Sequence, residues 1–195
     1  MIGAVVIAAG ASYRMGSPKP LLKIGDKTFL QHIVDVLRLA GIHEIVVVLG
    51  AEAGSIRGTL SWFNGTVVVN KDWEKGQLTS INTGIRALPN HRLEGAIIFP
   101  VDHPLISSKL VADLVTTFHN SRKKIVVPVH DGQRGHPVLF SSELFGELRT
   151  ADSSVGARQV VRAHAHNVEE VPTEDEGVLV NIDTPEDYRA RVLGL

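Results

Sequence analysis

The chain of 195 residues contains no cysteine, which excludes disulfides, thiolate metal sites and a cysteine nucleophile. Its formal net charge is −1, so it has no global positive field to attract nucleic acid or anionic lipid. It has no apolar run of membrane-spanning length, and no basic leader followed by an apolar stretch at its start. These absences predict a cytoplasmic protein that binds neither nucleic acid nor membrane.

The composition that is present, 44% hydrophobic and 21% charged, is that of a folded domain. The length suits a single domain over residues 1–195. Apolar, β-branched runs alternate with helix-like stretches, which predicts an α/β fold with a mostly parallel sheet. The predicted strands are 4–8, 44–49, 66–69, 96–100, 125–129, 137–140 and 177–182, and the predicted helices are 28–40, 53–60, 79–87, 107–121, 156–164 and 185–192.

The most informative segment follows the first predicted strand and reads AAGASYRMGSPK over residues 8–19. Its small residues let backbone N–H groups approach an anion closely, and Arg14 and Lys19 add positive charge. Nucleotide phosphates usually lie where the first strand of an α/β protein ends, so this loop predicts a polyphosphate substrate. The alternative is a tight turn with surface charges. Neither the Walker glycine spacing nor the dinucleotide fingerprint is present.

Three polar residues follow later predicted strands: Asp102, Asn181 and Asp183. In an open α/β sheet the carboxyl ends of the strands face the ligand crevice. Carboxylates from two such ends would hold one Mg²⁺ beside the phosphates, because Mg²⁺ accepts one or two carboxylates and fills its shell with water and phosphate oxygens. The alternative is that Asp183 only caps the last helix, whose start Thr184 and Pro185 indicate.

A polar, glycine-rich segment, residues 70–84, leads into a predicted helix. Its amides and the side chains of Gln77 and Ser80 suit the reading of a base edge. A solvated turn with Thr79 or Ser80 as the helix N-cap explains the same residues equally well. The sequence leaves these two interpretations open.

A second polar segment, residues 129–140, is predicted to connect two strands that pair antiparallel. His136 within it is the histidine favoured for substrate binding, and His103 beside Asp102 is a second candidate. The nine histidines include no His-x-x-x-His pair and no HExxH, so their spacing does not support a histidine metal site. A serine hydrolase is excluded because no Gly-x-Ser-x-Gly elbow is present.

Taken together, these motifs resemble those of MobA-like nucleotidyltransferases and, within that group, molybdenum cofactor cytidylyltransferases. The resemblance covers nearly the whole chain and is carried, in the family's order, by residues 8–19, 70–80, 100–104, 134–140, 156–158 and 181–187. It implies a Rossmann-like three-layer α/β/α sandwich of the nucleotide-diphospho-sugar transferase type. It also implies Mg²⁺-dependent transfer of a nucleotidyl group, CMP from CTP, to the phosphate of molybdopterin, with release of pyrophosphate.

The resemblance assigns roles to individual residues. It implies that the nucleotide binds to Ala8, Ala9, Gly10, Ala11, Ser12, Arg14, Gly16, Lys19, Gln77 and Ser80. It implies that Arg14, Lys19 and Asp102 carry catalysis, and that Asp102 binds the metal together with Asp183 or Asn181. The phosphorylated pterin would bind to Arg134 and His136. The start Ala8-Ala9-Gly10 resembles the form found in enzymes that use CTP. A molybdoenzyme that receives the product is a further implied partner.

One segment departs from the family pattern. Residues 151–158 lack the glycine that often precedes Asp152 and carry extra residues after it, which weakens a substrate-binding role for Asp152 or Arg158. The acceptor therefore stays open between molybdopterin and another phosphorylated compound, such as a sugar, an alditol or phospholactate. A non-catalytic chaperone for the pterin cofactor is a second alternative. A dinucleotide-dependent oxidoreductase is a third, and it lacks its fingerprint.

Overall fold

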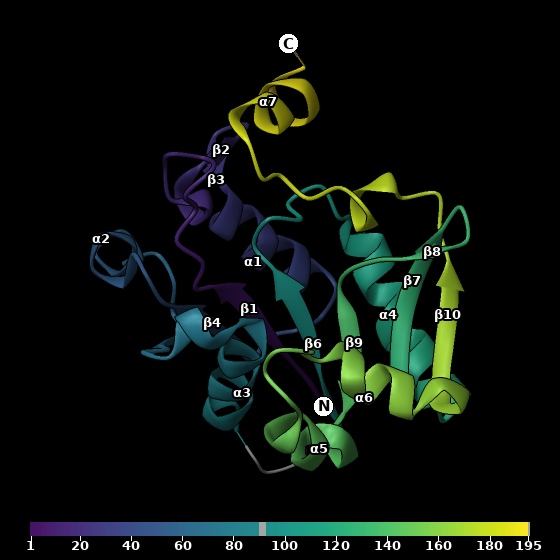
Figure 1. Cartoon of the computed structure of the whole chain (residues 1–195). Helices are drawn as coiled ribbons and strands as arrows, with labels where there is room; N and C mark the ends of the chain where they lie inside the picture. Colours follow the sequence, from purple (N-terminus) through teal and green to yellow (C-terminus); the bar gives the residue numbers. More distant parts are fainter. Residues whose placement is uncertain (90–92, 195) are drawn as a thin grey trace.

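The computed structural model describes residues 1–89 and 93–194, and within these ranges strands and helices alternate as predicted (Figure 1). The main sheet consists of β1 (Ile2–Ala8), β4 (Ile45–Leu49), β5 (Thr66–Val69), β6 (Gly95–Pro100), β7 (Ile125–His130), β8 (Gln133–Arg134), β9 (Val138–Ser141) and β10 (Val168–Pro172). A small hairpin, β2 (Lys23–Ile24) and β3 (Lys27–Thr28), stands apart from it. The helices are α1 (Phe29–Leu39), α2 (Ala53–Arg57), α3 (Gln77–Ala87), α4 (Ser108–Ser121), α5 (Phe145–Thr150), α6 (Arg158–Ala163) and α7 (Pro185–Tyr188).

The sheet has the order β10-β7-β9-β6-β1-β4-β5, with β8 paired to β7. β1 runs parallel to both β4 and β6, and β5 runs parallel to β4. β9 runs antiparallel to β6 and β7, which confirms the antiparallel pairing predicted around residues 129–140. The chain leaves β1 first toward β4 and later returns to β6 on the other side. The carboxyl ends of β1 and β6 therefore flank the switch point of the sheet, where α/β proteins bind ligands.

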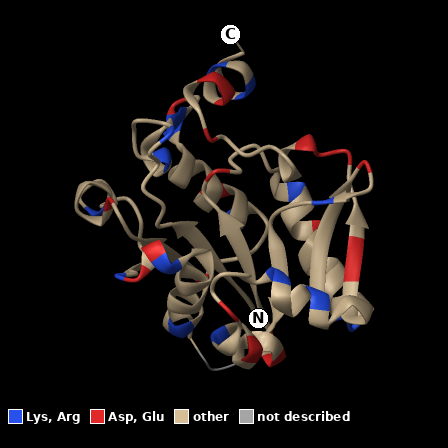
Figure 2. Cartoon of the chain, viewed as in Figure 1, with Lys and Arg blue, Asp and Glu red and all other residues tan. Residues whose placement is uncertain are grey.

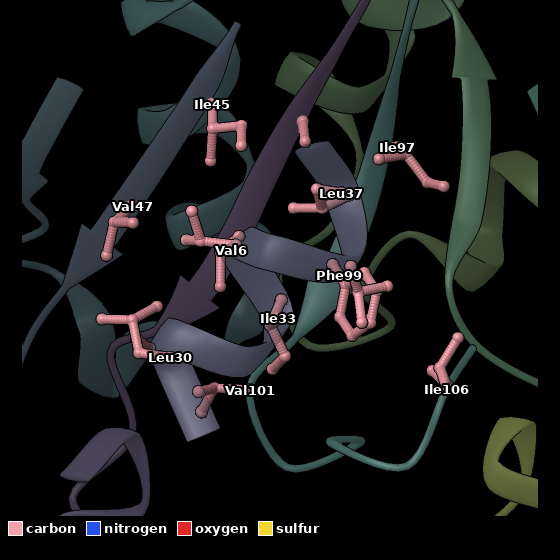
Figure 3. Close-up of a cluster of buried hydrophobic side chains, with 14 of the residues drawn as sticks. Val6, Leu30, Ile33, Leu37, Ile45, Val47, Ile97, Phe99, Val101 and Ile106 are labelled. Carbon is pink, nitrogen blue, oxygen red and sulfur yellow. The ribbon is translucent and has the colours of Figure 1, made fainter. Parts of the chain in front are cut away.

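Side chains of β1 alternate between two hydrophobic clusters on opposite faces of the sheet. Ala4, Val6 and Ala8 pack with α1 and α4, and Figure 3 shows part of this cluster. Val5 and Ile7 pack with α3, α5 and α6. The alternation follows from the two-residue period of a strand that is covered on both faces. The helices thus form two layers around the sheet, which confirms the predicted α/β/α sandwich.

Helix α3 approaches the sheet closely because Gly84 has no side chain. A Cβ at this position would lie 2.1 Å from Cγ1 of Val5 and 2.9 Å from Cγ2 of Val48. Such contacts are far inside van der Waals distance, so a larger residue would push the helix away from β1 and β4. This close packing carries the first turn of α3 to the carboxyl ends of the strands.

The predicted strand 177–182 is wrong. This segment contains a short 3₁₀ helix, Glu176–Val178, followed by irregular backbone. Ile182 is fully buried, so the apolar run reflects packing into the core beside the strand ends rather than pairing in the sheet. The N–H of Ile182 donates to the carbonyl of Asp102 at 2.7 Å. This bond places Asp183 near Asp102 without a strand.

Among the described strands and α-helices, five were not predicted from the sequence: β2, β3, β8, β10 and α5. β10 lies at the edge of the sheet and includes Glu169 and Glu170, so it has no continuous apolar run. α5 has only six residues, which is too short for a clear helical period. The predicted cap of the last helix is confirmed, because Thr184 and Asp187 form a capping box. The α-helix itself is shorter than predicted and continues as a π-helix, Arg189–Leu193. Across residues 1–89 and 93–194, no helix has the length and apolar character needed to cross a membrane.

Candidate functional site

A cavity of about 440 Å³ opens at the carboxyl ends of β1 and β6. It lies between the loop of residues 8–19, called the first loop below, the start of α3, the turn after β6 and the segment before α7. Of the residues predicted for the site, it is lined by Ala8, Ala9, Gly10, Ser12, Arg14, Lys19, Gln77, Ser80, Asp102 and Asp183. The fold therefore brings together residues that are more than 150 positions apart in the chain.

The first loop turns at Ser12, whose backbone is in the left-handed region with a φ of 50°, and local hydrogen bonds to Ser12 hold this turn. The Ser12 carbonyl accepts from the N–H groups of Met15 and Gly16 at 3.0 and 3.1 Å, and its hydroxyl accepts from the N–H of Lys19 at 3.1 Å. Met15 is buried and anchors the loop in the core. In the described part of the chain, no backbone carbonyl accepts from the N–H groups of residues 10–14. These donors are available to an anion.

Gly50, which follows β4, supports the start of the first loop. A Cβ on Gly50 would lie 2.3 Å from the carbonyl oxygen of Ala9. The N–H of Ala51 donates to the same oxygen at 3.1 Å. The backbone after β4 thus packs directly against the backbone after β1, and any side chain at position 50 would displace the loop.

The two cations of the first loop converge on Asp183. Arg14 Nη2 donates to Asp183 Oδ2 at 2.9 Å, and Lys19 Nζ donates to Asp183 Oδ1. Lys19 Nζ also lies 3.7 Å from Oδ2 of Asp102. Burial by itself would raise the pKa of Asp183, but the hydrogen bond and charge of Lys19, together with Arg14, outweigh it and hold that pKa below its usual value. Asp183 is therefore an anion held between two cations.

The side chain of Asp183 is not the cap of the last helix, since Thr184 fills that role. The alternative that Asp183 serves only as a helix cap is thus wrong. Asn181 lies beside it, and Asn181 Nδ2 donates to Asp183 Oδ2 at 2.8 Å. Asn181 therefore contacts the Asp183 carboxylate at the edge of the cavity.

The carboxylates suit a hard divalent cation. Oδ1 of Asp102 is buried and lacks a hydrogen-bond partner in the described structure, so it has an unused acceptor position. Asp102 and Asp183 both face Lys19 from one side of the cavity. Residues 1–89 and 93–194 contain no cluster of three or more His, Cys, Asp or Glu side chains that could enclose a metal. Two carboxylates fit Mg²⁺, because this ion keeps several positions for water and phosphate oxygens.

The start of α3 forms another wall of the cavity. The helix begins at Gln77, two residues before its predicted start, so neither Thr79 nor Ser80 is the N-cap. Ser80 is only 2% exposed, and its hydroxyl accepts from Asn70 Nδ2 at 2.9 Å. The same amide donates to Thr79 Oγ1 at 2.8 Å. Buried polar bonds thus fix the position of Ser80 in the cavity wall.

His103 and His136 lie next to each other beside Asp102. Their ring centroids are 4.8 Å apart, and His103 Nε2 is 3.9 Å from Asp102 Oδ1. Burial, with the charge of His103, lowers the pKa of His136 to about 4. Burial also lowers the pKa of His103. With these lowered pKa values both rings are neutral near pH 7. Neither ring lines the cavity, and His103 is only 8% exposed, so the two rings pack beside the Asp102 carboxylate.

Several predicted residues do not line the cavity, namely Ala11, Gly16, Arg134, His136 and Asn181. Arg134 is exposed on β8, and its Nε donates to Oε1 of Glu170 on β10 at 2.7 Å. The structure therefore does not bring Arg134 to the cavity. Trp73, which the sequence offered only within a motif, does line it. Its signal was a lone aromatic residue in an otherwise polar segment.

Comparison with known proteins identifies the family. Residues 4–168 match the MobA-like NTP transferase domain. The chain belongs to this family. The predicted membership of the MobA-like nucleotidyltransferases is thus confirmed, and with it the prediction that the chain is of the nucleotidyltransferase class.

Relatives of this MobA-like chain match along almost its full length. Nicotine blue oxidoreductase of Paenarthrobacter nicotinovorans is 29% identical over 93% of this chain and 92% of its own length. Molybdenum cofactor cytidylyltransferase of Escherichia coli is 25% identical over 96% of this chain and 93% of its own length. The crystal structure of Rv0371c from Mycobacterium tuberculosis covers 100% of this chain and 99% of its own, with a TM-score of 0.87 and 29% identity. Rv0371c is also known as a complex with manganese, with a TM-score of 0.80 and 27% identity over the same shares.

Proposed function

We propose that this chain is a Mg²⁺-dependent cytidylyltransferase that moves CMP from CTP to the phosphate of molybdopterin and releases pyrophosphate. The observation that carries the proposal is the convergence of Arg14, Lys19, Asp102 and Asp183 on one cavity beside the free N–H groups of the first loop. Anion donors, two cations and two carboxylates in one place suit a triphosphate and its metal.

The triphosphate would bind across the first loop, where Arg14 and Lys19 contact its charged oxygens. Both cations are paired with Asp183 in this structure, and a triphosphate would take over these contacts. The loop keeps its shape through the Ser12 bonds and the packing of Gly50 on Ala9. A site formed in advance in this way avoids the cost of ordering the loop when the nucleotide binds.

Asp102 and Asp183, with Asn181 beside them, would hold Mg²⁺. When bound, the ion would supply positive charge that polarises the phosphoryl oxygens. The unpartnered Oδ1 of Asp102 supports this assignment, and so does the manganese complex of the related protein Rv0371c. The release of Asp183 from Lys19 and Arg14 would then leave both cations free for phosphate.

The reaction requires positioning and charge more than proton transfer. An oxygen of the acceptor phosphate attacks the α-phosphorus of CTP while the bond from phosphorus to the α–β bridging oxygen breaks, and pyrophosphate leaves with the electron pair. A phosphate monoester has a second pKa of roughly 6 and is largely ionised near neutral pH, so no general base is needed. Lys19 and Arg14 stabilise the negative charge that develops on the leaving group.

Three features support cytosine and a pterin. The small Ala8 and Ala9 at the start of the first loop resemble enzymes that use CTP, and a full-length relative is a molybdenum cofactor cytidylyltransferase. Gln77 and Ser80 line the cavity from α3 and would contact the base or ribose. The neutral rings of His103 and His136 lie next to Asp102, tilted by 58° to each other, and a pterin that reached them would meet uncharged aromatic groups. Arg134 would have to leave Glu170 to reach such an acceptor.

Oxidoreduction is a second candidate, because a relative that matches over most of its length is named nicotine blue oxidoreductase. The dinucleotide fingerprint is missing from the first loop of this chain, where Ser12 and Met15 occupy two of its glycine positions. The cations and carboxylates around Asp183 suit nucleotidyl transfer, because they would bind the triphosphate and its metal. We therefore rank phosphate chemistry first.

The test is release of pyrophosphate by the purified chain with Mg²⁺ and CTP, GTP or ATP in turn. The acceptor in separate reactions is molybdopterin, a sugar phosphate, an alditol phosphate or phospholactate. We expect release with CTP, and a fall of roughly 10²–10³-fold in rate for Lys19→Met. Lys23→Met, an exposed lysine outside the cavity, serves as the matched control and should retain full activity. Release only with sugar or alditol phosphates would move the acceptor to that class. Binding of molybdopterin without pyrophosphate release from any triphosphate would indicate a chaperone. Oxidation of NADH or NADPH in the presence of nicotine blue would support the oxidoreductase.

A further inference from the structure

A second pocket, of about 260 Å³, lies between α3 and the turn that follows α5. It shares no lining residue with the first cavity. Its walls are polar and include Asn70, Asn82, Thr83, Arg86, Arg149 and Ser153. Apart from Asn70, which holds Ser80 in the wall of the first cavity, these residues have no part in the function proposed above.

Two arginines line this pocket from different helices. Arg86 lies in the last turn of α3 and Arg149 in the last turn of α5. Figure 2 shows positive residues on both helices, which pack against each other. Neither arginine forms an ion pair within residues 1–89 and 93–194, and the acidic residue of the lining, Asp72, pairs with Lys75 at 2.8 Å. Two arginines without a counterion favour an oxyanion that both can bind through paired N–H groups.

The pocket also has polar groups that suit the uncharged part of a ligand. Asn82 is 9% exposed, and its Nδ2 donates to the carbonyl of Leu148 at 3.0 Å. Its Oδ1 is buried and has no partner in the described structure, which is costly unless a ligand or a water bound with it donates there. Thr83 and Ser153 add hydroxyl groups. From these groups and the small volume, we propose that the second pocket binds a phosphomonoester with a short hydroxylated carbon chain, of pentose phosphate size.

The second pocket is connected to the first cavity through Asn70. Asn70 is 5% exposed and lines the second pocket, while its Nδ2 donates to Ser80 in the wall of the first cavity at 2.9 Å. Its Oδ1 accepts from the N–H of Asp72 at 3.0 Å. A ligand that contacts Asn70 therefore acts on the bonds that position Ser80. By linkage, each ligand changes the affinity for the other by the same factor.

The test is isothermal titration calorimetry of the full chain with ribose 5-phosphate, inorganic phosphate and ribose as separate probes. Ribose 5-phosphate should bind at least tenfold more tightly than either of the other two. The double variant Arg86→Ala/Arg149→Ala should lose at least tenfold in affinity, while Arg57→Ala, an exposed arginine on α2 outside both pockets, should bind as the wild type does. Absence of binding at millimolar ribose 5-phosphate, or equal affinity for inorganic phosphate, would overturn the proposal.

Two further measurements separate this site from the first cavity. Lys19→Met should leave ribose 5-phosphate binding unchanged, and loss of binding in that variant would place the ligand in the first cavity instead. Saturating ribose 5-phosphate should change the affinity for CTP at least threefold, and the double arginine variant should abolish that change. An unchanged CTP affinity would refute the connection through Asn70. The calorimetry with ribose 5-phosphate does not depend on whether the chain transfers nucleotides, so the two proposals can fail separately.

Discussion

Replacement of Asp183 by asparagine tests the charge arrangement of the first cavity. Asp183 accepts hydrogen bonds from Arg14, Lys19 and Asn181. Asparagine preserves the size of the side chain but removes its charge. Both cations then lose their shared counterion, and Asp102, 3.7 Å from Lys19 Nζ, becomes the nearby carboxylate among the described residues.

The expected loss of stability is modest. Two unit charges 3.7 Å apart attract each other by about 4.5 kcal/mol at an effective dielectric constant of about 20, and desolvation offsets most of this value. Lys19 therefore stays partly neutralised by Asp102 in the variant. Since the Asp183 side chain is 18% exposed, we expect the free energy of unfolding to fall by about 1–2 kcal/mol. For a chain of this size, that corresponds to a decrease in Tm of roughly 2–8 °C.

The expected change in ligand affinity has the opposite sign. One uncompensated positive charge about 5 Å from a phosphate oxygen contributes about 0.8 kcal/mol in water and about 3.3 kcal/mol at a dielectric constant of about 20. Because the Arg14 side chain is 70% exposed, the lower end applies. Without metal, CTP should therefore bind to Asp183→Asn about fourfold more tightly than to the wild type. The gain in affinity from Mg²⁺ should shrink, because one of the two carboxylates is missing.

The assay is calorimetry with CTP in EDTA and again in Mg²⁺, combined with thermal unfolding. Asp113→Asn is the matched control, since this residue pairs with Lys109 on α4, has a side chain that is 47% exposed and does not line the cavity. It should leave both CTP affinities unchanged. If Asp183→Asn bound metal-free CTP no more tightly than the wild type, Asp183 would not compete with phosphate for the two cations, and the reasoning would be refuted.

Three other variants test the site and the core. Asp102→Asn should remove most of the Mg²⁺-dependent pyrophosphate release, and full activity would contradict the metal assignment. The pKa of His136 is 6.5 in the unfolded chain and about 4 in the folded chain. As the pH falls from 6.5 to 4, the unfolded chain gains a proton that the folded chain does not, so the free energy of unfolding should fall by roughly 3 kcal/mol. In urea unfolding, the free energy of unfolding should fall less between pH 7 and pH 4.5 for His136→Phe than for the wild type. An equal fall in both proteins would show that His136 is not its cause. Gly84→Ala should destabilise by about 1–3 kcal/mol through contact with β1, while Gly58→Ala, which has open space around it, should change stability by less than about 0.5 kcal/mol in the same denaturation.

Local patterns made much of the fold predictable. Continuous apolar runs identified β1, β4 and β6, because strands covered on both faces need apolar residues at every position. The same pattern misled at residues 177–182, where the chain is buried beside the strand ends but pairs with no strand. It also missed β10, whose edge position permits glutamates within a strand. For residues 177–182 and for β10, the apolar pattern in the sequence reports how far the chain is buried and not whether it pairs in the sheet.

Consecutive residues and their spacing were enough to predict the first loop, the family and most of the residues that line the cavity. The pairs that these side chains form could not be predicted in this way. Lys19 meets Asp183 across 164 positions, Arg134 is held by Glu170 rather than by the cavity, and Arg86 joins Arg149 in a second pocket. Such contacts depend on the order of strands in the sheet and on which helix covers which face. No local pattern of residues encodes that order, since it results from the packing of the whole chain.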